Sequence, residues 1–241
     1  WVNKQGERVY IKYHWKTLQG LETITRQEAE KLAGSDPDAA VRKLHDDIEG
    51  GKFPQQELCV QIMNPCDVMK LSFDPLDDTK TWSETDFPLI PVGLMTLNRN
   101  PTNFFAQVEQ SAFCPGNLVP GVELSADKML QGRSFSYFDT QRHRIGPNFM
   151  QLPINRSISP VNNNQRDGNM TYDFNPEPIN YSPNSLNDNY PRPANISVPK
   201  PEYTEGYIAR MPILKPDDFT QAGEHFNSLN RFEKEQLSDN I

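Results

Sequence analysis

A long stretch without apolar periodicity, residues 157–216, sets the strongest limit on what this chain can fold into. Asn, Pro, Ser and Tyr dominate the stretch, and its apolar residues recur at neither the helical nor the strand spacing. A segment of this composition buries too little apolar surface to offset the backbone entropy that it loses on folding. Judged from its residues alone the stretch is a linker, so the packed structure has to come from residues 1–156 and 217–241.

Residues 1–98 predict an antiparallel meander of strands with helices inserted between them. Leu58, Val60 and Ile62 recur at every second position, which is the pattern of a strand with one buried face. The expected strands cover residues 1–3, 8–16, 57–63, 70–73 and 93–98. A meander of this kind is typical of half an antiparallel β-barrel, so the predicted fold class is α+β.

Helix start and stop signals mark the expected helices. Thr25 and, three residues later, Glu28 form a capping box, which predicts a helix over 26–33. Pro37 opens a second helix, which ends at the Gly50–Gly51 pair. Further helices are expected over 103–112, over 133–144, from 217 onward and over 231–241.

The helix expected over 133–144 is bracketed by glycines and carries an unusual face. Arg133, Tyr137, Gln141 and Arg144 follow one another at helical spacing, so they share one side. An arginine one turn before a tyrosine can place its guanidinium on the phenol oxygen, which favours the phenolate and lowers a pKa that is normally about 10. A phenolate suits ferric iron, and Arg144 could reach an anionic group beside it. The alternative is a half-buried aromatic residue next to a solvated helix face.

Composition limits the partners and the compartment. The net charge of −8 over 241 residues argues against nucleic acid or an anionic membrane as the main partner. Cys59, Cys66 and Cys114 lack CxxC spacing and are expected to be small buried residues, which favours a reducing, cytoplasmic location. No apolar run is long enough for a transmembrane helix. Because apolar residues make up only 36% of the chain, either the surface is rich in solvated loops or part of the core comes from elsewhere.

The segment from Arg133 to Gln141 resembles the proximal haem-ligand signature of the haem catalases. Five further runs match motifs of the same family: LNRNP at 97–101, FFAQVEQ at 104–110, MLQGR at 129–133, GPN at 146–148 and PINR at 153–156. The resemblance extends over nearly the whole chain and is greatest to the small-subunit, monofunctional bacterial catalases. Since the chain begins at Trp1 without a Met, it is expected to be the central to C-terminal portion of a longer protein.

The resemblance implies a division of the chain into four parts. Residues 1–98 would form the second half of an eight-stranded antiparallel barrel, and residues 99–156 the helices on the proximal side of the haem. Residues 157–216 would be an ordered wrapping arm that packs against other subunits of a homotetramer. Residues 217–241 would start a helical C-terminal domain.

The resemblance also implies an enzyme that dismutates hydrogen peroxide to water and dioxygen with a b-type haem. Tyr137 would be the axial iron ligand, Arg133 would keep it ionised, and Arg144 would pair with a haem propionate. Met129 is expected among the haem-binding residues. Asp127 would hold the proximal arginine indirectly, through a histidine upstream of Trp1, and is also a candidate helix N-cap.

The distal histidine and asparagine of the family are expected upstream of Trp1, so no catalytic residue is assigned in this chain. Its histidines are expected to be structural, and the chain alone is expected to lack catalase turnover; they are His14, His45, His143 and His225. Some relatives also bind NADPH. Positions that fall where those contacts occur are Lys16, Trp82, Gln221 and His225, although Glu84 replaces a histidine of the nucleotide-binding members.

Two other functions stay open from the sequence. One is a catalase-like protein that binds haem and serves as a structural or interaction module without turnover. The other is a hydroperoxide-processing enzyme on the same scaffold. Recovery of a distal histidine and asparagine would favour the catalase, and comparison of fatty-acid hydroperoxides with hydrogen peroxide would separate the last alternative.

Overall fold

A computed structural model describes residues 1–159, 167–174, 179, 181, 183–186, 209–212 and 215–241. The chain divides into two compact units, each built from two separate stretches. Unit 1 comprises the described residues of Trp1–Arg8 and Pro101–Lys200, and unit 2 those of Val9–Asn100 and Pro201–Ile241. Each unit is described by itself.

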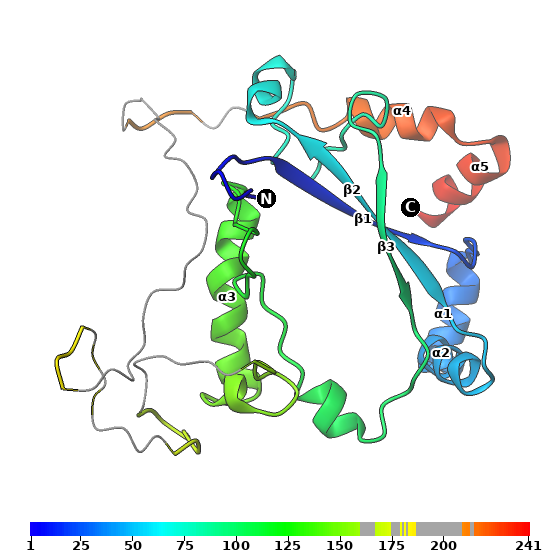
Figure 1. Cartoon of the computed structure of the whole chain (residues 1–241). Helices are drawn as coiled ribbons and strands as arrows, with labels where there is room; N and C mark the ends of the chain where they lie inside the picture. Colours follow the sequence, from blue (N-terminus) through cyan, green and yellow to red (C-terminus); the bar gives the residue numbers. More distant parts are fainter. Residues whose placement is uncertain (160–166, 175–178, 180, 182, 187–208, 213–214) are drawn as a thin grey trace. The chain divides into compact units, whose positions relative to one another are not determined.

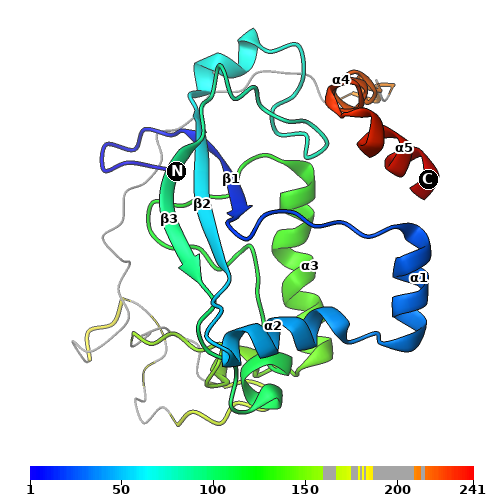
Figure 2. The ribbon, with the colours of Figure 1, turned by 90° about the vertical axis from the view of Figure 1, so that its right-hand side faces the viewer.

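Unit 2 is built on a three-stranded antiparallel sheet, which the ribbon shows from two sides (Figures 1 and 2). Its strands are β1 (Tyr10–Thr17), β2 (Gln55–Met63) and β3 (Ile90–Thr96), with β2 in the centre. A register shift between Leu58 and Cys59 marks a bulge against β3. The strands predicted over 8–16, 57–63 and 93–98 are confirmed, and with the helices they make the fold α+β.

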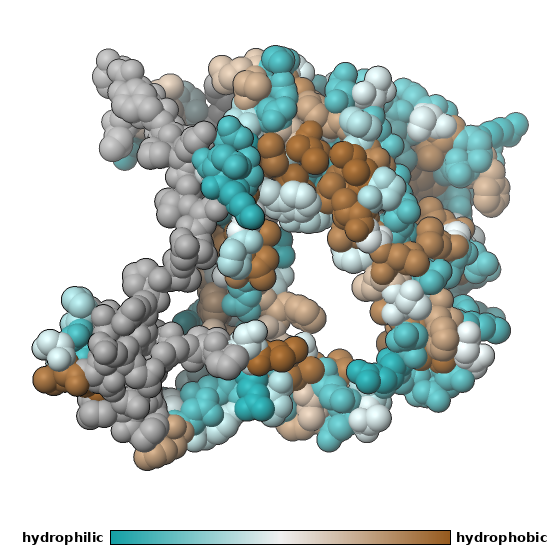
Figure 3. Space-filling view, viewed as in Figure 1, coloured by the Kyte–Doolittle hydropathy of each residue, from teal (hydrophilic) through white to brown (hydrophobic). Residues whose placement is uncertain are grey.

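The two faces of this sheet differ in how they are covered. Gln61 is fully buried, and its amide donates to the carbonyls of Trp82 and Phe87 at 3.3 and 2.6 Å. His14, beside it on β1, shares a hydrogen bond with the Gln61 amide oxygen at 2.8 Å. On the other face Tyr13 and Trp15 are about half exposed, at 50% and 53%. Apolar residues gather over the sheet in the space-filling view (Figure 3).

Two helices follow β1 in unit 2. The first, α1 (Arg26–Ser35), begins at the predicted capping box, where the Thr25 hydroxyl accepts from Glu28 N–H and the Glu28 carboxylate accepts from Thr25 N–H. The second, α2 (Ala39–Glu49), ends at Gly50 as predicted. Gly51 adopts a positive φ of 77°, which suits a glycine after a helix end.

The C-terminal helices α4 (Thr220–Ser228) and α5 (Arg231–Asn240) complete unit 2. The Gln221 amide oxygen accepts from Thr81 N–H at 2.8 Å, and its amide nitrogen donates back to the Thr81 carbonyl at 3.2 Å. Lys80 is 5% exposed and pairs with Asp218 at 3.1 Å. These contacts fix the start of α4 beside the loop that covers Gln61.

Unit 1 contains the long helix α3 (Lys128–Arg144), the π-helical turn η2 (Phe105–Glu109) and the 3₁₀ turn η3 (Phe149–Gln151). Its first residues form an isolated antiparallel bridge between Val2 and Arg8. Val2 N–H also donates to the Gly121 carbonyl at 2.9 Å. The N-terminal residues therefore join the stretch before α3 rather than the sheet.

Two of the predicted strands are wrong. Residues 1–3 contribute only the bridge to Arg8. Residue 70 is the last residue of the 3₁₀ helix η1 (Pro65–Lys70), and 71–73 continue into a bend. Both edges of β2 are taken by β1 and β3, so no position beside the central strand is left for residues 70–73. A short apolar run outside a sheet cannot form a strand alone.

The helix boundaries in unit 1 also differ from the predictions. The helix expected over 133–144 begins at Lys128, because Asp127 caps it, and Gly132 lies inside it. The helix expected over 103–112 is only the turn η2. The helix expected from 217 starts at Thr220, after the Asp217 carboxylate has accepted from Phe219 and Thr220 N–H.

The predicted wrapping arm lies largely outside the described residues, and the division into 1–98, 99–156, 157–216 and 217–241 stays a prediction. Within the part of the chain that the structure describes, no helix combines the length and the apolar character needed to cross a membrane.

Candidate functional site

Arg133 and Tyr137 lie one turn apart on α3, and their side chains meet. Arg133 Nη2 donates to Tyr137 Oη at 3.4 Å. The guanidinium carbon lies 5.2 Å from the centroid of the phenol ring, so the cation also faces the ring. Tyr137 is half-buried and Arg133 is exposed. This is the arrangement that the helical spacing predicts.

The other side of α3 packs within unit 1 and fixes the helix there. The rings of Phe138 and Phe149 have their centroids 6.1 Å apart. A Cβ added to Gly116 would lie 3.1 Å from Phe138 Cε2 and 3.4 Å from the Ser134 carbonyl oxygen, so the loop backbone approaches α3 closely. Arg133 stays exposed and Tyr137 half-buried beside this packing, and we call the face of α3 that carries them its open side.

Arg144, at the end of α3, donates most of its side-chain hydrogen bonds to groups within unit 1. Its Nη1 donates to the Glu109 carbonyl and its Nη2 to the Ser111 carbonyl, both at 2.6 Å. Its Nε and Nη2 also donate to the Gln141 amide oxygen, at 3.1 and 2.7 Å. A guanidinium has five N–H groups, so these contacts leave one of them for another acceptor. A propionate held by two parallel hydrogen bonds would have to displace one of these contacts.

Sequence reasoning placed Gln141 on the face of Tyr137 without assigning it a role, and it missed Asn155 as a functional candidate. Gln141 is buried, and its amide nitrogen donates to the Phe113 carbonyl at 3.3 Å. Asn155 donates to the Gln110 and Phe149 carbonyls at 2.8 and 3.0 Å and accepts from Ala112 N–H at 2.8 Å. The position of Gln141, one turn after Tyr137 on the same helix face, was the available signal.

Asp127 and Met129 stand at the start of α3. The Asp127 carboxylate accepts from Met129 N–H at 2.8 Å and from Leu130 N–H at 3.4 Å, so the residue is the helix N-cap. This leaves its other carboxylate oxygen for a further partner. Met129 is 56% exposed and lies two turns before Tyr137, on the open side of the helix. Their haem-related roles stay predictions.

The open side of α3 offers one ligand atom, a phenol oxygen. This fits an iron whose other ligands come mainly from a prosthetic group. Among the described residues, no three His, Cys, Asp or Glu side chains come together at a place that could hold a metal ion. A phenol oxygen beside a guanidinium would supply one ligand to the iron of a haem, and the porphyrin would supply its four nitrogens. Tyr137, Arg133 and Met129 are the residues that would meet such a group.

The residues predicted to contact NADPH all lie in unit 2, and most are already engaged. Lys16 Nζ lies 4.0 Å from a Glu84 carboxylate oxygen. Trp82 is 5% exposed, and its indole N–H donates to the Pro75 carbonyl at 2.9 Å. Gln221 is paired with Thr81, and His225 is exposed on α4. A nucleotide would therefore have to compete for Gln221, and its binding stays a prediction.

Two of the remaining histidines have side-chain partners within unit 2, and the structural role of all three stays a prediction. His14 is bonded to Gln61, and His45 Nδ1 lies 3.2 Å from its neighbour Asp46. His143 is exposed on α3. None of these contacts pairs a histidine with Tyr137.

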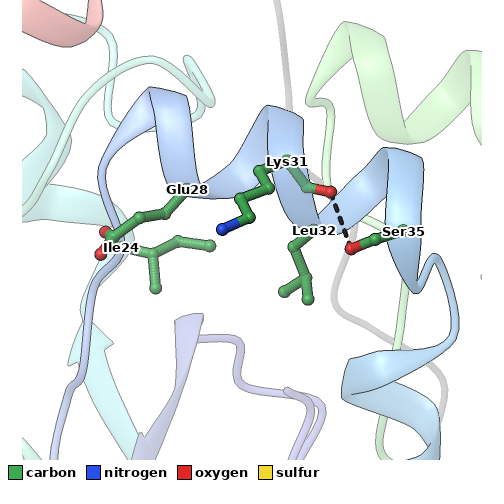
Figure 4. Close-up of a pocket in the computed structure, with 5 residues that line it drawn as sticks. All are labelled: Ile24, Glu28, Lys31, Leu32 and Ser35. Carbon is green, nitrogen blue, oxygen red and sulfur yellow. Dashed lines mark hydrogen bonds between the residues drawn. The ribbon is translucent and has the colours of Figure 1, made fainter.

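A shallow groove lies beside α1 in unit 2 (Figure 4). It is lined by Ile24, Glu28, Lys31, Leu32 and Ser35. The Glu28 carboxylate caps α1 through Thr25, and the Ser35 hydroxyl donates to the Lys31 carbonyl at 2.9 Å. We assign this groove no catalytic role, because its carboxylate and hydroxyl stabilise the helix.

Comparison with known proteins gives consistent matches. The profile of the family described as "Catalase" matches residues 1–188. A "Catalase" of Methanosarcina barkeri (strain Fusaro / DSM 804) is 46% identical over 100% of this chain and 48% of its own length. "Catalase A" of Pseudomonas putida is 43% identical over 100% of this chain and 50% of its own. A solved structure titled "Structure of a bacterial catalase" matches with a TM-score of 0.87 and 43% identity, covering 100% of this chain and 51% of that one. The chain thus spans about half the length of these relatives.

Proposed function

Because the chain belongs to the catalase family, we propose that the protein containing it is a haem catalase that dismutates hydrogen peroxide to water and dioxygen. The observation that carries this proposal is the contact between the Arg133 guanidinium and the Tyr137 phenol oxygen on the open side of α3. Haem, when bound, supplies an iron centre that exchanges electrons with peroxide.

In this proposal Tyr137 binds the iron through its phenolate oxygen, and Arg133 stabilises the negative charge on that oxygen. An N–H of the guanidinium already points at the phenol oxygen, so no rearrangement is needed to favour the anion. Packing of Phe138 against Phe149 holds α3, and therefore the ligand, in a fixed orientation within unit 1. Arg144 offers a hydrogen bond to a propionate.

Proton transfer between the two peroxide oxygens needs a further acid–base group. His14 and His45 are engaged with Gln61 and Asp46 within unit 2, and we propose that a histidine and an asparagine elsewhere in the protein carry out this step. The chain alone, loaded with haem, should therefore release little oxygen from peroxide.

Further proposals concern the fold, the assembly, the cofactors and the location of the complete protein. The antiparallel sheet, with its half-exposed face, is part of an eight-stranded barrel in the complete protein. Residues 157–216 wrap neighbouring subunits of a homotetramer. The haem is b-type, and an NADPH near Lys16 and Gln221 accompanies it.

The protein works in the cytoplasm, because its three cysteines are free thiols. Cys59 is buried as predicted, and burial raises the pKa of its thiol. The prediction of burial was wrong for Cys66, which is exposed, and Cys114 is half-buried.

The test is the absorption spectrum of the complete protein with haem, together with oxygen release from peroxide. The parent should show a high-spin ferric Soret band, and Tyr137→Phe should shift this band and lower turnover on the order of a hundredfold or more. Tyr181→Phe, at an exposed tyrosine of unit 1, is the matched control and should change neither. A Tyr137→Phe protein with the parent spectrum and turnover would refute the proposal.

A further inference from the structure

Gln141 is a buried polar residue in the middle of the hydrogen bonds that surround Arg144. It is 6% exposed, although most of α3 is exposed or half-buried. Both ends of its amide are in use: the oxygen accepts from Arg144, and the nitrogen donates to the Phe113 carbonyl. A buried amide with both ends satisfied is rigid, because any rotation would leave a polar group without a partner.

The geometry of the two contacts from Arg144 restricts its guanidinium. Nε and Nη2 both reach the same Gln141 oxygen, at 3.1 and 2.7 Å, so the planar group is held along one edge. The Glu109 and Ser111 carbonyls hold Nη1 and the second N–H of Nη2. An arginine side chain held in this way is already fixed in one rotamer. It therefore loses little further conformational entropy when a ligand binds.

We infer that Gln141 is a positioning residue for Arg144: its amide orients the guanidinium so that the one remaining N–H, on Nη1, meets a carboxylate of the bound cofactor. This rests on the proposed haem site and adds to it a specific means of recognising the propionate. The recognition is a single preorganised, charge-assisted hydrogen bond rather than a flexible two-point clamp.

The experiment compares haem with its dimethyl ester, in which both propionates are neutral, in the complete protein. The measured quantity is the ratio of the rates at which ester and haem transfer to apomyoglobin. In the parent, haem should be retained about tenfold longer than the ester, as expected for a charge-assisted hydrogen bond. Gln141→Met, of similar size and helix propensity, should lower this ratio about threefold to tenfold.

Two comparisons separate positioning from a general loosening of the fold. Loss of packing alone would speed the release of haem and ester equally and leave the ratio unchanged. Gln141→His, whose neutral ring offers one donor and one acceptor like the amide, should restore the ratio. In an Arg144→Leu background Gln141→Met should have no further effect, because the two changes remove the same contact.

An unchanged ratio in Gln141→Met, in a protein whose Soret band depends on Tyr137, would overturn this inference and leave the haem site intact. Absence of that Soret band in the parent would instead refute the proposed function. If Gln141→Met does not fold, Gln141→Glu keeps the acceptor for Arg144 and loses only the donor to Phe113. It should keep the ratio, and a fall there would equally overturn the inference.

Discussion

Asn155 shows how much a single side chain contributes in unit 1. Its amide makes three hydrogen bonds to the backbone, at Gln110, Ala112 and Phe149. We expect Asn155→Leu to lower the free energy of unfolding by about 2–4 kcal/mol, because each lost bond costs about 1 kcal/mol and partly buried backbone groups are left without partners. Chemical denaturation followed by far-UV circular dichroism measures this change.

The control for this prediction is Asn227→Leu, at an exposed position of α4. It makes the same chemical change without removing a contact between segments, so its effect should stay within about 0.5 kcal/mol. If both variants lowered the free energy of unfolding equally, the hydrogen bonds of Asn155 would not be what stabilises the packing of these segments.

The residue-scale predictions succeeded where the interaction is local. One helical turn is enough to predict that Arg133 meets Tyr137, and the position of Asp127 before an expected helix is enough to suggest a cap. The contacts of Gln141 and Asn155 with the backbone of residues 110–113 were not predicted, because those residues lie in another segment. Spacing along one helix cannot show which loop backbone will lie beside it.

At the scale of single elements, the start of α1 should depend on pH. Hydrogen bonds from Thr25 N–H and the Thr25 hydroxyl hold the pKa of the Glu28 carboxyl below its usual range. A depressed pKa in the folded state contributes stability above the unfolded pKa of about 4.3, and this contribution is lost as pH falls through the folded value. Glu28→Gln should therefore be less stable than the parent near pH 7.

That difference should shrink as the pH falls below about 4, because the protonated carboxyl then resembles the amide. Thermal unfolding of both proteins at a series of pH values measures it. Glu30→Gln, two residues further along the same helix, is the control. A constant gap between Glu28→Gln and the parent from pH 7 to pH 3 would contradict the prediction.

The elements themselves follow sequence patterns wherever the pattern is long or capped. The alternation in 57–63 gives β2, and the Thr25–Glu28 box gives α1. The prediction that Gly132 precedes its helix was wrong, because one glycine in an otherwise helical run weakens the helix without ending it. The run at 70–73 had the composition of a strand but no open strand edge beside β2 to pair with.

At the scale of the whole molecule, the sheet should make this chain associate when it is produced alone. Among the described residues β1 and β3 each pair on one side only, and Tyr13 and Trp15 are half exposed beside them. Unpaired strand edges next to apolar side chains promote self-association. Light scattering and sedimentation should show oligomers that grow with concentration.

Trp15→Glu should reduce this association, because it places a charge on the half-exposed face of β1. Leu21→Glu is the control, since Leu21 is 89% exposed but lies outside the sheet. If Leu21→Glu lowered the oligomer fraction as much as Trp15→Glu, association would follow net charge rather than the sheet.

The whole-molecule predictions are the ones that sequence reasoning supports least. The low apolar content of 36% indicated that a chain of this length does not bury a full core, and the half-exposed sheet agrees with that. The barrel and the wrapping arm rest on the family alone, because closing a sheet and ordering an arm depend on strands and subunits outside these residues.

The pairing of Lys80 with Asp218 has a consequence for how the protein is made. The two residues are 138 positions apart, so at about 5–20 residues per second the ribosome adds the carboxylate roughly 7–28 s after the lysine. Until then Asp77, three residues earlier and 3.6 Å away in the folded chain, is the acidic partner left to a lysine that ends up almost fully buried. The loop over Gln61 should therefore stay open to chaperones and proteases during translation and close only once the α4 segment has left the exit tunnel.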